Sequence, residues 1–237
     1  MCTLSWLLHE NGYDVFFNRD EQRSRAKAIP PVLNPEHNTI MPIDPEGQGT
    51  WIASNRQGMT LCLLNNYQKQ LSKNQAVNFV SRGQLIPELI RLDNKIEDNL
   101  KSIDLSQYQA FFLCAFPAGL SRKQNSIAIY QWDGNTLTQE KVQQPVISSG
   151  VLLPQVKQTR EQTFKKIIAQ NKTTAEHLAF HKSHLPEKGF ASVCMHREDA
   201  RTQSLCHISI KHDITFRYQD GPPCKNKPWT EIKTTML

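Results

Sequence analysis

The dipeptide Asn11-Gly12 is the feature that most restricts how this chain can fold. Asn-Gly between two apolar runs is the strongest short-range signal for a β-hairpin, because both residues tolerate positive φ. The flanking segments, residues 2–8 and 13–17, are rich in residues that favour strands. The sequence therefore predicts that the chain begins with an antiparallel hairpin.

The hairpin should bring the N-terminus beside a charged segment. If Asn11-Gly12 forms a two-residue loop, the register places Cys2 opposite Glu21 and Leu4 opposite Arg19. The thiol of Cys2 is then expected close to the polar end of the second strand.

Further along the chain, strand-like and helix-like segments alternate in blocks. Helices are predicted at 76–101 and at 159–182, with a break near 171–174 where Thr173 and Glu176 could cap the second piece. Residues 30–45 are proline-rich and expected to be irregular. The predicted strands are 49–53, 59–64, 110–116, 126–132, 136–142, 190–196, 202–211 and 213–218. This order is typical of antiparallel sheets covered by helices, in one domain of residues 1–237 with a tail at about 219–237.

Composition and charge exclude several classes of protein. Of the 237 residues, 38% are hydrophobic and 21% are charged, which is typical of a soluble globular protein. No run of 18 apolar residues and no signal peptide is present, so we expect no integral membrane span and a cytoplasmic location. The six cysteines lack the spacing of a disulfide framework. The charge of +6 is spread along the chain, and no nucleic-acid motif accompanies it.

The combination of Cys2 with Arg19 and Asp20 has a chemical interpretation. A nearby guanidinium stabilises a thiolate, and a carboxylate can orient an α-amino group that acts as the base. Cysteine is small enough for the initiator methionine to be removed, which would expose that amine. Taken alone, however, the same residues also fit a small buried cysteine beside a charged strand end.

Several motifs strengthen the chemical interpretation, because together they resemble those of one family. The chain resembles the NRDE family, also called the transport-and-Golgi-organization family, and looks like a bacterial-type member. The resemblance implies a fold of the α+β class: a four-layer αββα sandwich of two antiparallel sheets flanked by helices, similar to N-terminal-nucleophile (Ntn) hydrolases. The matching segments are Met1-Cys2, Phe17-Asn18-Arg19-Asp20-Glu21, Gly49-Thr50-Trp51-Ile52, Leu64-Asn65-Asn66-Tyr67, Ser81-Arg82-Gly83 and Ala200-Arg201-Thr202-Gln203-Ser204.

The resemblance also implies roles for individual residues. By analogy with cysteine Ntn hydrolases such as bile-salt hydrolases and penicillin V acylases, the catalytic positions correspond to Cys2, Arg19, Asp20, Asn66 and Arg201. The chain departs from that pattern in two places. Arg19 and Asp20 are adjacent, and neighbouring strand residues point to opposite faces. Ser149 stands where family members carry an asparagine, and the loss of an oxyanion donor can lower a rate by about 10²–10³-fold.

Soft metal ligands and histidines are present elsewhere in the sequence. Cys194-Met195-His196 and Cys206-His207 lie on two predicted strands and could bind zinc or haem iron, but Cys206 shares a face with apolar residues. We therefore predict no metal site. His177, His181 and His184 have helical spacing and are expected on a solvated face, with contact to haem as the alternative.

Two functions remain open from the sequence. One is intracellular binding and trafficking of an anionic hydrophobic cargo, such as haem or an acyl-CoA-like molecule, by a protein that needs no cofactor of its own. The alternative is an N-terminal cysteine amidohydrolase that acts on a linear acyl-amide bond. The departures at Ser149 and at Arg19-Asp20 favour the first, and whether the chain is an enzyme stays open.

Overall fold

Two antiparallel sheets form the centre of the protein in the computed structural model, which describes residues 1–69, 79–92, 95–141, 143–168 and 172–237. The first sheet has the order β10 (Val146–Ser148), β1 (Cys2–His9), β2 (Gly12–Gln22), β11 (Ala200–Ile210), β12 (Asp213–Asp220), β13 (Thr230–Thr235). The second has the order β3 (Ile29–Asn34), β4 (Thr39–Ile43), β5 (Ile52–Asn55), β6 (Thr60–Asn65), β7 (Phe111–Phe116), β8 (Ala128–Trp132), β9 (Leu137–Glu140).

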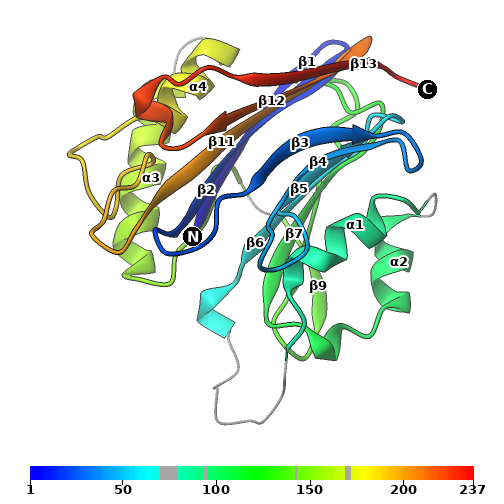
Figure 1. The fold of residues 1–237 in the computed structure, drawn as a ribbon, viewed down its shortest axis with the longest axis horizontal. Helices are drawn as coiled ribbons and strands as arrows, with labels where there is room; N and C mark the ends of the chain where they lie inside the picture. Colours follow the sequence, from blue (N-terminus) through cyan, green and yellow to red (C-terminus); the bar gives the residue numbers. More distant parts are fainter. Residues whose placement is uncertain (70–78, 93–94, 142, 169–171) are drawn as a thin grey trace.

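Helices cover the outer faces of both sheets, so the molecule has four layers (Figure 1). Helices α3 (Leu153–Ile168) and α4 (Thr174–Lys182) pack on the first sheet, and α1 (Leu85–Leu89) and α2 (Ile96–Ser102) lie on the side of the second. The 3₁₀ helices are η1 (Tyr67–Lys69), η2 (Arg82–Gln84), η3 (Leu105–Gln107) and η4 (Pro223–Lys225). This architecture confirms the predicted α+β sandwich. None of the helices in the described residues has the length and apolar character needed to cross a membrane.

The alternation of side chains along β1 and β2 explains the layering. Leu4 and Phe17 point between the sheets into the main apolar core, whereas Thr3 and Ser5 contact side chains of α3 and α4. A second core lies under α1 and α2 and includes Leu85, Leu89, Ile96 and Leu100. β1 and β2 therefore each present one apolar face and one face with polar groups.

The first hairpin forms as predicted, but its register differs by two residues. The turn is Glu10-Asn11, and Gly12 already pairs with His9. Gly12 has φ +117°, and a Cβ there would lie 2.0 Å from the carbonyl oxygen of Ile210, so the glycine belongs to the close approach of β11. The predicted pairing of Cys2 with Glu21 is wrong, and Cys2 lies directly opposite Arg19. Since the shift is an even number of residues, Cys2 keeps the predicted face.

Three segments differ from the sequence prediction. Residues 30–45 contain most of β3 and all of β4, because Pro30 and Pro31 lie on an edge strand, where a missing N–H donor is tolerated. Residues 190–196 are a loop whose only strand-type contact in the described chain is the bridge between His196 and Arg201. The expected tail contains η4 and the edge strand β13.

The helical predictions are confirmed in part. The capping box of Thr173 and Glu176 begins α4, as the sequence indicated. Helix α3 begins at Leu153, six residues earlier than predicted. Parts of the predicted segments 76–101, 136–142 and 159–182 lie outside the described residues.

Candidate functional site

A cavity of about 320 Å³ opens between the two sheets at the N-terminus. Its polar wall comes from β1, β2 and the segments that follow β2 and β4, with Asn65 at the end of β6 and Arg82 in η2, and its apolar wall comes from β6 and the segments before β5 and η2. The residues that line the cavity include Met1, Cys2, Arg19, Glu21, Arg25, Asp44, Trp51, Leu63, Asn65, Phe79, Val80 and Arg82. Cys2 and Arg19, two of the site residues expected from the sequence, therefore lie at this cavity.

The thiol of Cys2 lies in this cavity on the strand next to Arg19. Burial raises its pKa above the ordinary value, and the N-terminal ammonium and Arg19 only partly oppose that effect. With the chain in this state, the thiol is protonated at neutral pH and is a poor nucleophile.

The terminal amine belongs to Met1 and is held as a cation. Its nitrogen donates to the main-chain oxygen of Asp20 at 3.0 Å and to the hydroxyl of Tyr67 at 3.3 Å. Burial alone would lower its pKa, but Tyr67, Cys2 and Asp20 together raise the pKa to about 10. An amine-assisted attack by Cys2 would therefore require the removal of Met1.

Arg19 is fixed by three neighbours on the cavity side of β2. Its Nη2 lies 2.6 Å from Oδ2 of Asp44 and 3.5 Å from Oε2 of Glu21, and its guanidinium stacks 4.6 Å from the ring centre of Trp51. Asp44 also accepts from Nε of Arg25 at 2.8 Å. Both carboxylates are thus already paired with arginines before any ligand binds.

The carboxylate of Asp20 points to the opposite face, as strand alternation predicts. Its Oδ2 lies 3.0 Å from Nη1 of Arg160, and both side chains are fully buried. Thr202 donates to Asp20 Oδ1 at 2.6 Å. The sequence prediction missed Arg160, although its position one helical turn after the buried Val156 on α3 was a usable signal.

Of the other positions considered from the sequence, Ser149 lies beside the N-terminus, whereas Asn66 and Arg201 do not line the cavity. Asn66 is buried, but the asparagine that lines the cavity is Asn65, which donates to Tyr67 at 3.0 Å. Arg201 lies outside the residues that line the cavity and donates to Gln203 at 3.2 Å. Ser149 does lie beside the N-terminus, with its hydroxyl 2.8 Å from the sulfur of Met1 and 2.6 Å from the oxygen of Val151.

The chain as a whole is similar to known proteins. The model of the family described as transport and Golgi organisation 2 matches residues 1–216. The chain belongs to that family. The prediction made from Phe17–Glu21 and the accompanying motifs is thereby confirmed. A search of the curated proteins found no match for this family member.

Two solved structures share the fold of this family member. The N-acylethanolamine-hydrolyzing acid amidase ortholog of Caenorhabditis elegans is 10% identical with a TM-score of 0.56, covering 87% of this chain and 92% of that chain. The C2A mutant of the conjugated bile acid hydrolase from Clostridium perfringens is 9% identical with a TM-score of 0.56, covering 99% and 92%. At these identities the similarity shows an Ntn-hydrolase-like fold.

Arg82 differs from Arg19 and Arg25, the other arginines that line the cavity, in its hydrogen-bond partners. It donates from Nη1 to the main-chain oxygen of Ala110 at 2.9 Å, and no carboxylate in the described residues forms an ion pair with it. Burial lowers its pKa, opposed by the nearby Tyr67 and Cys2, yet a guanidinium remains charged at neutral pH. The Ser81-Arg82-Gly83 motif of the family pointed to this segment, but the predicted site residues did not include Arg82.

A cluster of histidines lies on the helix side of β1 and β2. Ser5 Oγ is 2.9 Å from Nδ1 of His177 and 2.9 Å from Nε2 of His181, and Phe16 stacks on both rings. The expected solvated histidine face is wrong, because α4 packs these residues against polar groups of the sheet. His177 and His181 are 1% and 0% exposed, so they are part of the protein interior.

Proposed function

We propose that this family member binds and carries an anionic amphiphile inside the cell, with the charged group of the cargo in the cavity next to Cys2. Haem, which has two propionates, and acyl-CoA-like molecules belong to this chemical class. The observation that supports the proposal best is Arg82, a half-buried cavity cation that no carboxylate of the described residues neutralises. An arginine in such a position favours a ligand with a carboxylate or phosphate.

The apolar wall supports a ligand that is not only charged. The apolar residues that line the cavity come from β6 and from the segments before β5 and η2, and they are Trp51, Leu63, Phe79 and Val80. The volume of about 320 Å³ is at the lower end of the range of roughly 300–1,000 Å³ for ligand pockets. A headgroup fits within this space, whereas a bulky body would extend toward the opening.

Replacing Arg82 by alanine is expected to weaken haem binding by about 10- to 100-fold, which corresponds to a lost charged hydrogen bond of about 1.5–3 kcal/mol. The dissociation constant is measured by titrating ferric haem into the protein and following the Soret band. Acyl-CoA competes in a second series, which separates a haem-specific site from a general site for anionic amphiphiles.

The matched control is Arg122→Ala, because Arg122 is exposed and donates to the main-chain oxygen of Leu8, away from the cavity. Both variants remove one positive charge, so general electrostatic attraction changes equally. Equal haem affinity of the two variants, or no binding to the wild type at micromolar concentrations, would refute the proposal.

A second candidate function is hydrolysis of an acyl amide by Cys2. It is favoured by the position of Cys2 opposite Arg19 in the cavity and by the two solved structures, which are named as hydrolases of N-acylethanolamines and of conjugated bile acids. Against it, Ser149 donates to Val151 and Asn65 donates to Tyr67, so both of these side chains already have hydrogen-bond partners. For this reason we place binding first.

Intact-mass measurement and an activity assay separate the two candidates. The hydrolytic mechanism requires protein that lacks Met1, cleaves N-acyl amides and loses this activity in Cys2→Ala. We expect instead that N-acyl amides are not cleaved, even by protein from which Met1 has been removed. Turnover that depends on Cys2 would reverse this order of preference.

A further inference from the structure

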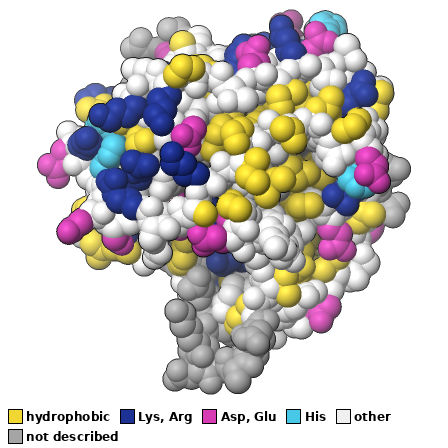
Figure 2. All heavy atoms as spheres, in the orientation of Figure 1, with side chains coloured by type: hydrophobic (Ala, Val, Ile, Leu, Met, Phe, Trp, Pro, Cys, Tyr) yellow, Lys and Arg dark blue, Asp and Glu magenta, His cyan; other side chains and the backbone are white. Residues whose placement is uncertain are grey.

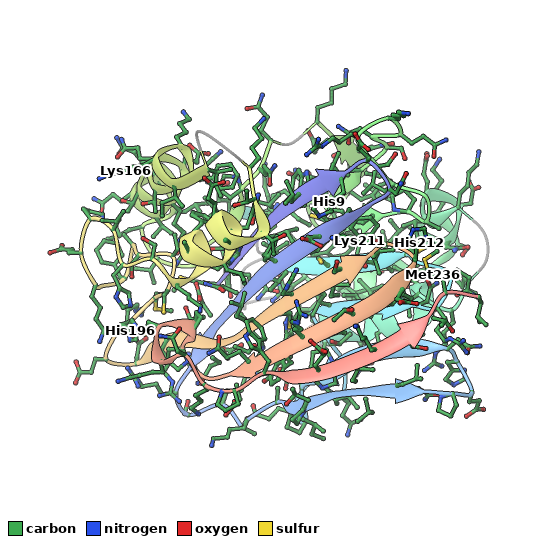
Figure 3. The ribbon with its side chains drawn as sticks, turned by 90° about the horizontal axis from the view of Figure 1, so that it is seen from above. His9, Lys166, His196, Lys211, His212 and Met236 are labelled. Carbon is green, nitrogen blue, oxygen red and sulfur yellow. The ribbon has the colours of Figure 1, made fainter. Side chains whose placement is uncertain are left out.

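Four side chains with metal-binding atoms meet at one end of the first sheet, away from the cavity next to Cys2. They are His184, Cys194, His196 and Cys224. His184 follows the end of α4, Cys194 and His196 lie in the loop before β11, and Cys224 lies in η4. Figure 3 shows His196 at the opposite end of this sheet from His9 and His212. The fold brings these residues together from three separate segments of the chain.

The distances in this cluster fit a tetrahedral metal site. All four ligand atoms lie within 4.8 Å of one another. Nε2 of His196 is 3.5 Å from Sγ of Cys194 and 3.5 Å from Sγ of Cys224. Bonds of about 2.3 Å to sulfur and about 2.0–2.1 Å to nitrogen give ligand separations of about 3.3–3.8 Å in a tetrahedron.

His184 provides an independent indication. Its Nε2 is shielded from solvent, yet it forms no hydrogen bond with any described residue. Its ring meets that of His196 edge to face, with 5.1 Å between the ring centres. A buried ring nitrogen without a partner is unfavourable, and a metal ion would satisfy it.

The loop that carries Cys194 and His196 is held in place by main-chain hydrogen bonds. The nitrogen of Cys194 donates to the oxygen of Ser183 at 3.0 Å, and the nitrogen of His196 donates to that of Gly189 at 3.1 Å. Asn18 Nδ2 also donates to the oxygen of Val193 at 3.0 Å. The ligands therefore stand on a preorganised backbone, as a metal site requires.

Basic side chains are common on the surface around the cluster. Lys and Arg side chains gather on the side of the molecule where η4 and the loop before β11 lie (Figure 2). Lys182 Nζ, for example, donates to Asn226 Oδ1 at 2.9 Å, next to η4. Burial nevertheless raises the pKa of the Cys194 thiol, so a metal ion that binds there would displace its proton.

We propose that His184, Cys194, His196 and Cys224 bind one Zn²⁺ ion in a structural Cys₂His₂ site. Two thiolates and two imidazoles in tetrahedral geometry select zinc over Mg²⁺ or Ca²⁺, which prefer oxygen ligands. A disulfide between Cys194 and Cys224 would not explain why His184 and His196 direct ring nitrogens toward the same cluster. The combination considered from the sequence, Cys194 and His196 with Cys206 and His207, is wrong, because Cys206 lies in the core between the sheets.

The ion would fasten the loop before β11 to η4. Met195, Arg197 and Asp199 of this loop line a second hollow of about 180 Å³, which also touches Met1 and Asp20. A zinc ion would thereby support one wall of the region around the N-terminus without contacting a ligand there.

Metal analysis of the full-length wild type, purified without a histidine tag, tests the site directly. We expect about one zinc per chain by elemental analysis. Exchange with Co²⁺ should give the intense visible bands of tetrahedral coordination together with thiolate-to-cobalt charge transfer. Absence of zinc, a cobalt spectrum without thiolate bands, or a disulfide between Cys194 and Cys224 in the metal-free protein purified under reducing conditions would overturn the proposal.

Variants locate the site within the chain. Cys224→Ser and His184→Ala should each reduce the bound zinc at least tenfold after brief treatment with a chelator. Cys206→Ala and His212→Ala are the matched controls, since they change the same residue types outside the cluster, and they should retain the zinc. Full zinc content in Cys224→Ser would overturn the assignment, and the cobalt spectrum of the wild type decides the question if a variant does not fold.

Discussion

Replacing Arg160 by methionine is expected to lower the free energy of unfolding by about 3–5 kcal/mol, because it leaves one buried charge without its partner. Arg160 and Asp20 are both fully buried, with 3.0 Å between Nη1 and Oδ2. Methionine fills much of the space of arginine but offers no donor, so only Thr202 would remain hydrogen-bonded to the carboxylate. Urea denaturation at neutral pH measures this loss.

A double-mutant cycle separates the ion pair from packing effects. Asp20→Asn in the Arg160→Met background removes the unpaired charge, so the double variant should be less destabilised than the sum of the two single variants. Arg217→Met is the matched control, because Arg217 pairs with Glu231 on the surface and should contribute about 0–1 kcal/mol. A loss below about 1 kcal/mol in Arg160→Met would show that the pair does not stabilise the fold.

Lowering the pH from 7 to 4.5 is expected to reduce the free energy of unfolding by about 2–3 kcal/mol through His177 alone. Burial lowers the pKa of His177 to about 4, and burial also holds that of His181 well below its ordinary value. Between pH 6.5 and about 4 the unfolded chain binds protons that these folded histidines do not. Stability is therefore greatest above pH 6.5 and falls as the pH decreases through this window.

The variant His177→Gln tests which residue causes this decrease. It should lower stability at pH 7, where Ser5 loses a buried partner, and make the change between pH 7 and 4.5 smaller. His212→Gln serves as the control, because His212 is exposed in the turn after β11. Asp14, whose pKa is lowered by His207 and Thr174 despite burial, loses its stabilising effect only below its ordinary pKa of about 4. An unchanged pH dependence in His177→Gln would contradict the explanation.

The sequence predicted those parts of the fold that depend on local patterns. The Asn11-Gly12 signal located the hairpin but not its exact turn, because a turn at Glu10-Asn11 and one at Asn11-Gly12 both contain part of the signal. The close approach of β11 to Gly12 selects the turn at Glu10-Asn11. The prolines of residues 30–45 suggested irregular structure because a sequence pattern does not distinguish an edge strand from a loop.

Only those residues of the candidate site that belong to a sequence motif could be predicted. Cys2, Arg19 and Asp20 come from one hairpin, so their proximity could be derived from the sequence. Arg160 and Arg82 reach them from other elements, and tertiary packing alone brings them there. The same applies to the cluster around His196, whose members come from three segments and required the folded chain to be recognised.

Met1 lies against two hollows at the N-terminus. Its side chain contacts Ser149, and it lines both the cavity of about 320 Å³ and the hollow of about 180 Å³. Excision of this single residue would enlarge the space around the N-terminus and make the amine of Cys2 the new terminus. The processing of the first residue would then set the size of the molecule that fits, which a comparison of haem affinity between trimmed and untrimmed protein can measure.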